Sequence, residues 1–216
     1  MPVPPPRLSP RGVPRWPATL ALLAVGGLLA LVSGQLTLGP PWVPLAVAAV
    51  LAIPLTVASL REQHDWRRAL AFVGLATVTV AVGASAIFLV RQLLEGGQVE
   101  GSYLLSGAGA IWAANLLTFA LWYWEIDGGG PGKRRRDGHV STDFLFPQMQ
   151  IGDGKAIGWW PGFLDYMFVA FNASTAFSPT DTLILSRRGK VLMMVQALIS
   201  AVTVVVIAAR AINTLG

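Results

Sequence analysis

Long runs without a single charged residue are the feature that most limits how this chain can fold. Such runs lie at 16–33, 42–60, 69–90, 103–124 and 191–209. An apolar stretch of about 18 residues or more crosses roughly 30 Å of hydrocarbon as a helix. Each run therefore predicts a transmembrane helix.

The composition supports the same conclusion, because 54% of the residues are hydrophobic and only 12% are charged. A soluble globular domain carries about a quarter charged residues. Most of the Trp residues lie at or beside the ends of the runs, where indole rings favour the headgroup level. We expect an all-α integral membrane helical bundle in the lipid bilayer, with five full spans and one short helix before the last span.

Lys and Arg are distributed unequally between the two sides of this predicted bundle. Segments 1–15, 61–68 and 125–161 together hold eleven of them, whereas segments 34–41 and 91–102 hold Arg91 alone. Loops rich in Lys and Arg tend to stay on the cytoplasmic side. The distribution predicts a multi-pass protein of the cell membrane with a cytoplasmic N-terminus, and it explains the net charge of +5 without nucleic acid.

The chain divides into segments of different character. We expect a disordered Pro- and Arg-rich cytoplasmic tail at 1–15, a four-helix transmembrane region at 16–124 and a cytoplasmic loop at 125–161. The remainder, 162–216, holds the short helix, the "SPTDT" loop and the final transmembrane helix.

The cytoplasmic loop contains several groups that could bind a ligand. Its basic run from Lys133 to Arg136 suits anionic lipid headgroups or simply sets the topology. Its acids and His139 have no fixed spacing on one element, so a solvated loop is a better interpretation than a metal or acid–base site.

The stretch "FLDYMFVAFNASTAF" at 163–177 resembles a helix, but fifteen residues reach only about 22 Å. It could be a short, tilted full span or a re-entrant half-helix, and the sequence leaves both open. Asp165 and Asn172 are seven residues apart and so share one face. We expect that face to point at the bundle interior or at a watery cavity.

The residues after this helix are small, hydroxylated or acidic. Pro179 cannot continue a helix. Neighbouring hydroxyls can form hydrogen bonds with the backbone groups left unpaired at the helix end. The loop is either a capped connection between two helices or an ion- or water-contacting loop at the mouth of a cavity. The candidate residues of this cavity or loop are Asp165, Asn172, Thr175, Ser178, Thr180 and Asp181.

The final helix carries a polar stripe made of Gln196, Ser200, Thr203 and Arg210. Offsets of 0, 4, 7 and 14 place these residues on one side of a helix. The stripe could line a polar path, or it could form interhelical hydrogen bonds with Arg210 snorkelling at the helix end.

The last third, with "EIDGGGP", "DFLFPQ" and the long run that begins "FLDYMFVAFNASTAFSPTDT", resembles a family of small bacterial multi-pass membrane proteins of unknown function. A weaker similarity links it to the pore region of potassium-channel-like proteins, with 175–181 where the filter Thr-Val-Gly-Tyr-Gly-Asp stands. Both filter glycines are missing, so this resemblance implies a shared architecture without a working potassium filter.

Two functions remain open at this stage. The protein is channel-like or transport-related with a degenerate pore loop, or it is a non-transporting membrane scaffold or regulatory subunit. A homo-oligomer is a further expectation. No nucleophile–base pair or metal constellation stands out, so we expect no enzyme, no cofactor and no metal site.

Overall fold

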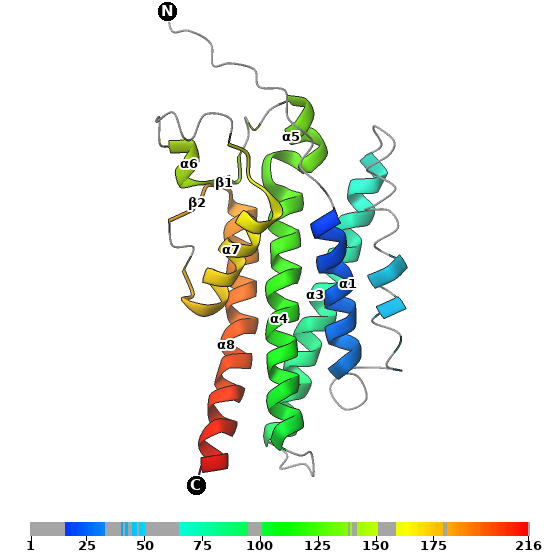
Figure 1. Ribbon diagram of the computed structural model, residues 1–216, viewed down its shortest axis with the longest axis vertical. Helices are drawn as coiled ribbons and strands as arrows, with labels where there is room; N and C mark the ends of the chain where they lie inside the picture. The colour runs from blue at the N-terminus through cyan, green and yellow to red at the C-terminus, as the bar shows by residue number, and fades with distance from the viewer. Residues whose placement is uncertain are drawn as a thin grey trace, which may run out of the picture.

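The computed structural model describes residues 16–32, 40, 42, 45–46, 48–50, 65–94, 101–137, 139, 142–150, 159–178 and 181–215. These residues form an all-α bundle with one very small sheet, which confirms the all-α part of the predicted fold class. Its long helices lie side by side in an elongated molecule (Figure 1). They are α1 (Trp16–Val32), α3 (Asp65–Leu94), α4 (Gly101–Ile126) and α8 (Arg187–Leu215).

Three of the described helices are long and apolar enough to cross a membrane, with spans at Arg68–Leu94, Ser102–Gly129 and Arg187–Ala209. The apolar helix α1 is shorter, at 17 residues. The predicted span at 42–60 lies largely outside the described residues. Long apolar segments form helices readily, because a helix pairs every internal backbone N–H and C=O within the segment itself.

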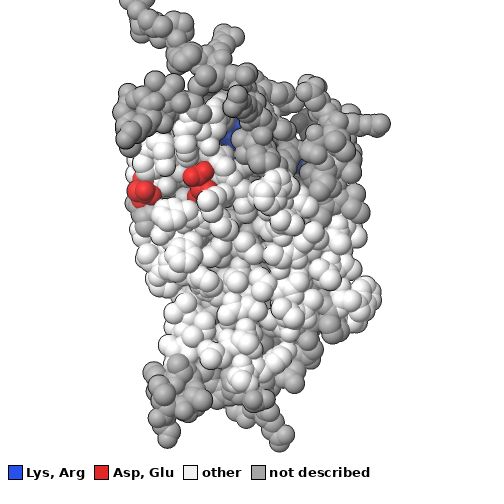
Figure 2. Space-filling model, viewed as in Figure 1, with Lys and Arg blue, Asp and Glu red and all other residues white. Residues whose placement is uncertain are grey.

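The bundle is apolar outside and polar at points inside. On α8, Leu198 and Val205 are exposed, whereas Gln196 and Ser200 are fully buried. Figure 2 shows uncharged side chains over the middle of one face. The acidic side chains in this view lie towards the end of the molecule that holds the C-terminus of α4. This distribution is the reverse of a water-soluble bundle and is typical of helices packed within lipid.

Helix α4 is the centre of the bundle, since it contacts α1, α3, α7 and α8. Small residues allow the close approach, with Ala108 and Ala114 both fully buried. Trp122 Nε1 donates a 2.8 Å hydrogen bond to Thr79 Oγ1 and so joins α4 to α3.

The segment after α4 folds back onto the end of the bundle. It forms a 3₁₀ turn η1 (Asp127–Gly129), α5 (Pro131–Asp137), β1 (Phe144–Leu145) and α6 (Pro147–Gln150). Positive φ angles at Gly128, Gly129 and Gly130 reverse the chain. Phe144 and Phe146 are buried in the core, and β1 pairs antiparallel with β2 (Leu183–Ile184). The expectation of a solvated loop is wrong for Asp127 and Asp143 of this segment, because both are buried beside these phenylalanines.

Helix α7 (Phe163–Thr175) is short and begins at the same end of the bundle as α8. Tyr166, in its second turn, bonds to Asp127 just beyond α4, and Arg188 in the first turn of α8 bonds to Ile126 O. Ser174, near the other end of α7, meets Gln196 of α8. The two helices therefore run in the same direction, and the chain after α7 returns to the end from which α7 started (Figure 1).

We predict that Gly128→Ala lowers the free energy of unfolding by about 1–2 kcal/mol or more, because a side chain at positive φ is disfavoured. Gly128 has φ of +55°, and a Cβ there would lie 2.9 Å from Arg134 Cγ. Thermal unfolding of the purified protein in detergent measures the change. Gly27→Ala is the control, since nothing lies within 4 Å of a Cβ at Gly27. Equal melting temperatures for the two variants would contradict the turn geometry.

Candidate functional site

The side-chain amide of Gln196 joins three helices in the middle of the bundle. Its Nε2 donates to Ala170 O of α7 at 2.7 Å and to Ser174 Oγ at 2.8 Å. Its Oε1 accepts the hydroxyl of Tyr123 from α4. A buried amide costs free energy unless it is hydrogen-bonded, and here both ends are paired. We call this group and its neighbours the Gln196 layer.

Asn115 of α4 extends the same layer. Its Nδ2 donates to Gln196 O at 3.1 Å and to Ser200 Oγ at 2.8 Å, so α4 and α8 are joined at two levels. Thr203 bonds instead to carbonyls of its own helix, at Ile199 and Ser200. The spacing predicts one inward stripe, and the structure buries Gln196, Ser200 and Thr203. The side-chain bonds at Gln196 and Ser200 are interhelical. The side chain of Arg210 lies outside the described residues.

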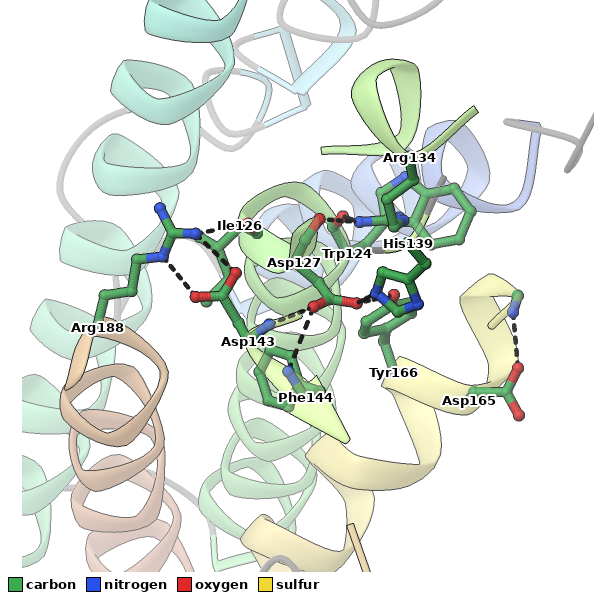
Figure 3. Close-up of polar contacts among 11 residues, drawn as sticks. Trp124, Ile126, Asp127, Arg134, His139, Asp143, Phe144, Asp165, Tyr166 and Arg188 are labelled. Atoms are coloured by element: carbon green, nitrogen blue, oxygen red, sulfur yellow. Dashed lines mark hydrogen bonds and ion pairs between the residues drawn. The ribbon is translucent and has the colours of Figure 1, made fainter. Parts of the chain in front are cut away.

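A second polar group is centred on the carboxylate of Asp127, directly after α4 (Figure 3). Its Oδ2 contacts Tyr166 Oη and His139 Nε2, both at 2.6 Å. Its Oδ1 accepts the backbone N–H of Asp143 at 2.7 Å and of Phe144 at 3.2 Å. Burial raises the pKa of the Tyr166 phenol well above its ordinary value, so this hydroxyl stays protonated and donates. The carboxylate thus anchors both α7 and the β1 segment to the end of α4.

Arg134 of α5 supplies positive charge beside this group. Its Nη1 donates to Trp124 O at 2.9 Å and to Asp127 O. Its guanidinium lies 5.0 Å from the ring centroid of Trp124 and 5.3 Å from that of Tyr166, within cation–π range. Arg134 is buried and Lys133 is exposed, so only part of the basic run at Lys133–Arg136 faces outward among the described side chains.

Arg188 fastens the start of α8 to the same end. Its Nε and Nη2 donate to Asp143 Oδ1 and Oδ2, each at 2.6 Å, and Nη2 also donates to Ile126 O at 3.1 Å. Bidentate arginine–carboxylate pairs combine charge with fixed geometry. These roles of Asp127, His139 and Asp143 were not predicted from the sequence. The available signal was the apolar run "FLF" directly after Asp143, which a solvated loop would not carry.

The residues predicted for the short helix are not gathered in the interior. Asp165 is half-buried on the outer flank, where its Oδ2 accepts the Gly162 N–H at 2.7 Å and caps α7. Burial raises the pKa of the Asp165 carboxyl. Asn172 and Thr175 bond back to carbonyls of their own helix. Of the two alternatives predicted for Asp165 and Asn172, the bundle interior does not apply, because Tyr166, Ala170 and Ser174 occupy that face. Asp165 lines a cleft on the flank instead.

The loop residues lie along the outside of the bundle. Ser178 and Asp181 are exposed, and Thr182 is buried with its hydroxyl 3.4 Å from Asp181 Oδ1. Thr180 lies outside the described residues. Asp165 and Asp181 line the same cleft, which measures about 480 Å³ and opens beside α7. The structure therefore brings two of the predicted loop residues together, at a flank and not in the interior.

The arrangement is suited to holding helices together and to binding at its flank. Within the described ranges, no group of three or more His, Asp or Glu side chains could hold a metal ion. Asp127 and Asp143 are both engaged by hydrogen-bond donors, and neither is presented to a cavity that the structure describes.

No protein family, curated protein or solved structure matches this chain. The two family resemblances seen in the last third of the sequence therefore stay predictions.

We predict that Gln196→Leu lowers the free energy of unfolding by about 1–3 kcal/mol, because buried partners lose their hydrogen bonds. The partners left behind are the Tyr123 hydroxyl and Ala170 O. Thermal unfolding in detergent measures the loss. Gln148→Leu makes the same change at an exposed position of α6 and should alter stability little. An unchanged melting temperature for Gln196→Leu would mean that the layer contributes nothing to stability.

Proposed function

We propose that the protein is a multi-pass integral membrane protein in which α7 is a re-entrant half-helix. In this proposal the connection behind α7, meaning the chain between α7 and β2, lines a passage between copies of the protein. The protein is then channel-like. The observation that carries the proposal is the position of this polar, exposed connection part-way along the apolar helices.

The surface of the long helices supports membrane integration. Val80 on α3 is 72% exposed and Val205 on α8 is 65% exposed, with further large apolar side chains around them. Extended apolar surface of this kind is rare on soluble monomers and marks contact with lipid or with other proteins.

The length and direction of α7 support a re-entrant helix. Thirteen residues rise about 20 Å, which is short of the roughly 30 Å hydrocarbon core. Because α7 and α8 start at one end, a full crossing by α7 would leave the chain on the wrong side to begin α8. Arg187 and Lys190 also lie at this end, together with Lys133. This agrees with the tendency of Lys and Arg to gather on the cytoplasmic side of a membrane.

The depth of the connection supports a passage. Ser174 lies level with Gln196, eight residues beyond Arg188 and hence roughly 12 Å into the apolar layer. Beyond it, Thr175, Ala176 and Ser178 are exposed. Irregular backbone at such depth is tolerated only where protein covers it or water reaches it. A neighbouring copy with a water-lined gap between the copies supplies both.

The proposed passage is not a potassium filter. A carbonyl-lined filter needs backbone conformations that glycine adopts easily. The described part of this connection contains no glycine, and Phe177 takes its positive φ of +52°.

A second candidate is a non-transporting scaffold or regulatory subunit. It is favoured by the Gln196 layer, where the amide of Gln196 and the Nδ2 group of Asn115 form hydrogen bonds that join α4, α7 and α8. Polar residues used in this way stabilise a bundle without conducting anything.

Single-cysteine labelling tests the re-entrant helix, and the chain contains no native cysteine to interfere. We predict that Gly132→Cys in α5 and Arg187→Cys at the start of α8 react with impermeant reagents from the same side, the cytoplasm. Ser102→Cys, at the start of α4, should react from the opposite side. Labelling of positions 132 and 187 from opposite sides would show that α7 spans the membrane.

Ion flux in reconstituted liposomes tests the passage. We predict that Thr175→Val and Ser178→Ala change flux several-fold without lowering the melting temperature, because both side chains are exposed. The matched control is Ser106→Ala, which removes an exposed hydroxyl near the start of α4. Wild-type flux no greater than that of empty liposomes would contradict the passage and favour the scaffold.

A further inference from the structure

The cleft beside α7 is apolar over most of its wall. It lies between α7, residues 146–148 and residues 181–182, and it measures about 480 Å³. That volume is within the range of small-molecule sites. Leu116, Phe146, Met167 and Phe171 are among the side chains that form its wall.

The charged side chains among the described lining residues of the cleft are both acidic. They are Asp165 and Asp181, and the part of the lining that the structure describes contains no Lys or Arg. The chain as a whole is basic, with 16 Lys and Arg against 11 Asp and Glu. Acidic side chains stand out against neighbouring uncharged side chains in Figure 2. The cleft is therefore complementary to a cation.

The polar and apolar parts of the cleft lie at different depths. Asp165 is in the first turn of α7, and Asp181 closely precedes β2, which pairs with β1 at the same end of the bundle. Phe171 follows Asp165 by six residues and lies roughly 9 Å deeper along the helix. A ligand that fits this gradient has a cationic head at the shallow end and an apolar chain at the deep end.

We propose that this cleft binds a membrane lipid whose headgroup carries an ammonium group. The ammonium group lies between Asp165 and Asp181, and an acyl chain follows the apolar wall past Met167 towards Phe171. An ammonium group there offsets the cost of partly burying the Asp165 carboxylate. The proposal rests on the proposed membrane integration and is independent of the passage between copies.

The site also explains the apolar face that α7 leaves uncovered. Leu164 and Phe168 are exposed on the flank and line the cleft as well. An acyl chain lying against them would cover this surface without requiring a second protein.

Binding of phosphatidylethanolamine to the full-length protein in detergent tests the proposal, with phosphatidylglycerol as the anionic comparison. Native mass spectrometry and the shift in melting temperature on titration both report it. We expect phosphatidylethanolamine to be retained and to raise the melting temperature, and phosphatidylglycerol to do so at least about tenfold more weakly, since two carboxylates attract one headgroup and repel the other.

The charge is tested with the double variant Asp165→Asn, Asp181→Asn. Asparagine keeps a side-chain oxygen that can accept the Gly162 N–H, so the cap of α7 is retained while the charge is removed. The preference for phosphatidylethanolamine should fall about tenfold in this variant. A preference equal to wild type, or equal binding of both lipids by wild type, would overturn the proposal.

The space is tested with Leu164→Trp, which places a larger ring at the mouth of the cleft. It should weaken phosphatidylethanolamine binding, whereas Leu105→Trp, on the exposed surface of α4 near its other end, should leave binding unchanged. Equal effects of the two variants would contradict this site. Lipid binding is measured in detergent and does not depend on ion flux. The lipid site and the passage between copies can therefore be contradicted independently of each other.

Discussion

The side-chain amide of Gln196 is hydrogen-bonded to α4 and α7 at once, and the position of α7 depends on it. In an apolar interior an amide group has few alternative partners, so leaving any of these bonds unmade is costly. The amide therefore fixes how far α7 extends along α8. The position of the exposed connection after α7 depends on these bonds.

The opposite end of α7 is held by charge. Asp127 receives Tyr166 of α7 and two backbone N–H groups of the β1 segment, while Asp143 of that segment holds Arg188 of α8. A buried carboxylate is stable only when donors surround it, and here the donors come from separate parts of the chain. The bonds at Asp127 join α4 to α7 and the β1 segment, and the Arg188–Asp143 pair adds α8 at the same end.

These two anchors give the proposed functions a common origin. Held at Tyr166 and at Ser174, α7 ends part-way along the bundle. In the proposed membrane arrangement, the polar connection after it lies at a depth where lipid cannot satisfy its backbone. The same placement leaves Leu164, Asp165 and Phe168 on the flank as the wall of a cleft. The proposed passage uses the deep end of α7, and the proposed lipid site uses the shallow end and the flank.

The sequence by itself determined the all-α class, the apolar helices and the inward stripe of Gln196, Ser200 and Thr203, because hydropathy and the helical repeat are local properties. It could not decide the direction of α7, since a segment of that length is compatible with a tilted span or a re-entrant helix. It also misjudged Asp127, His139 and Asp143 as solvated. Their partners are Tyr166, Arg188 and backbone groups far along the chain, and only the tertiary structure brings such partners within hydrogen-bonding distance.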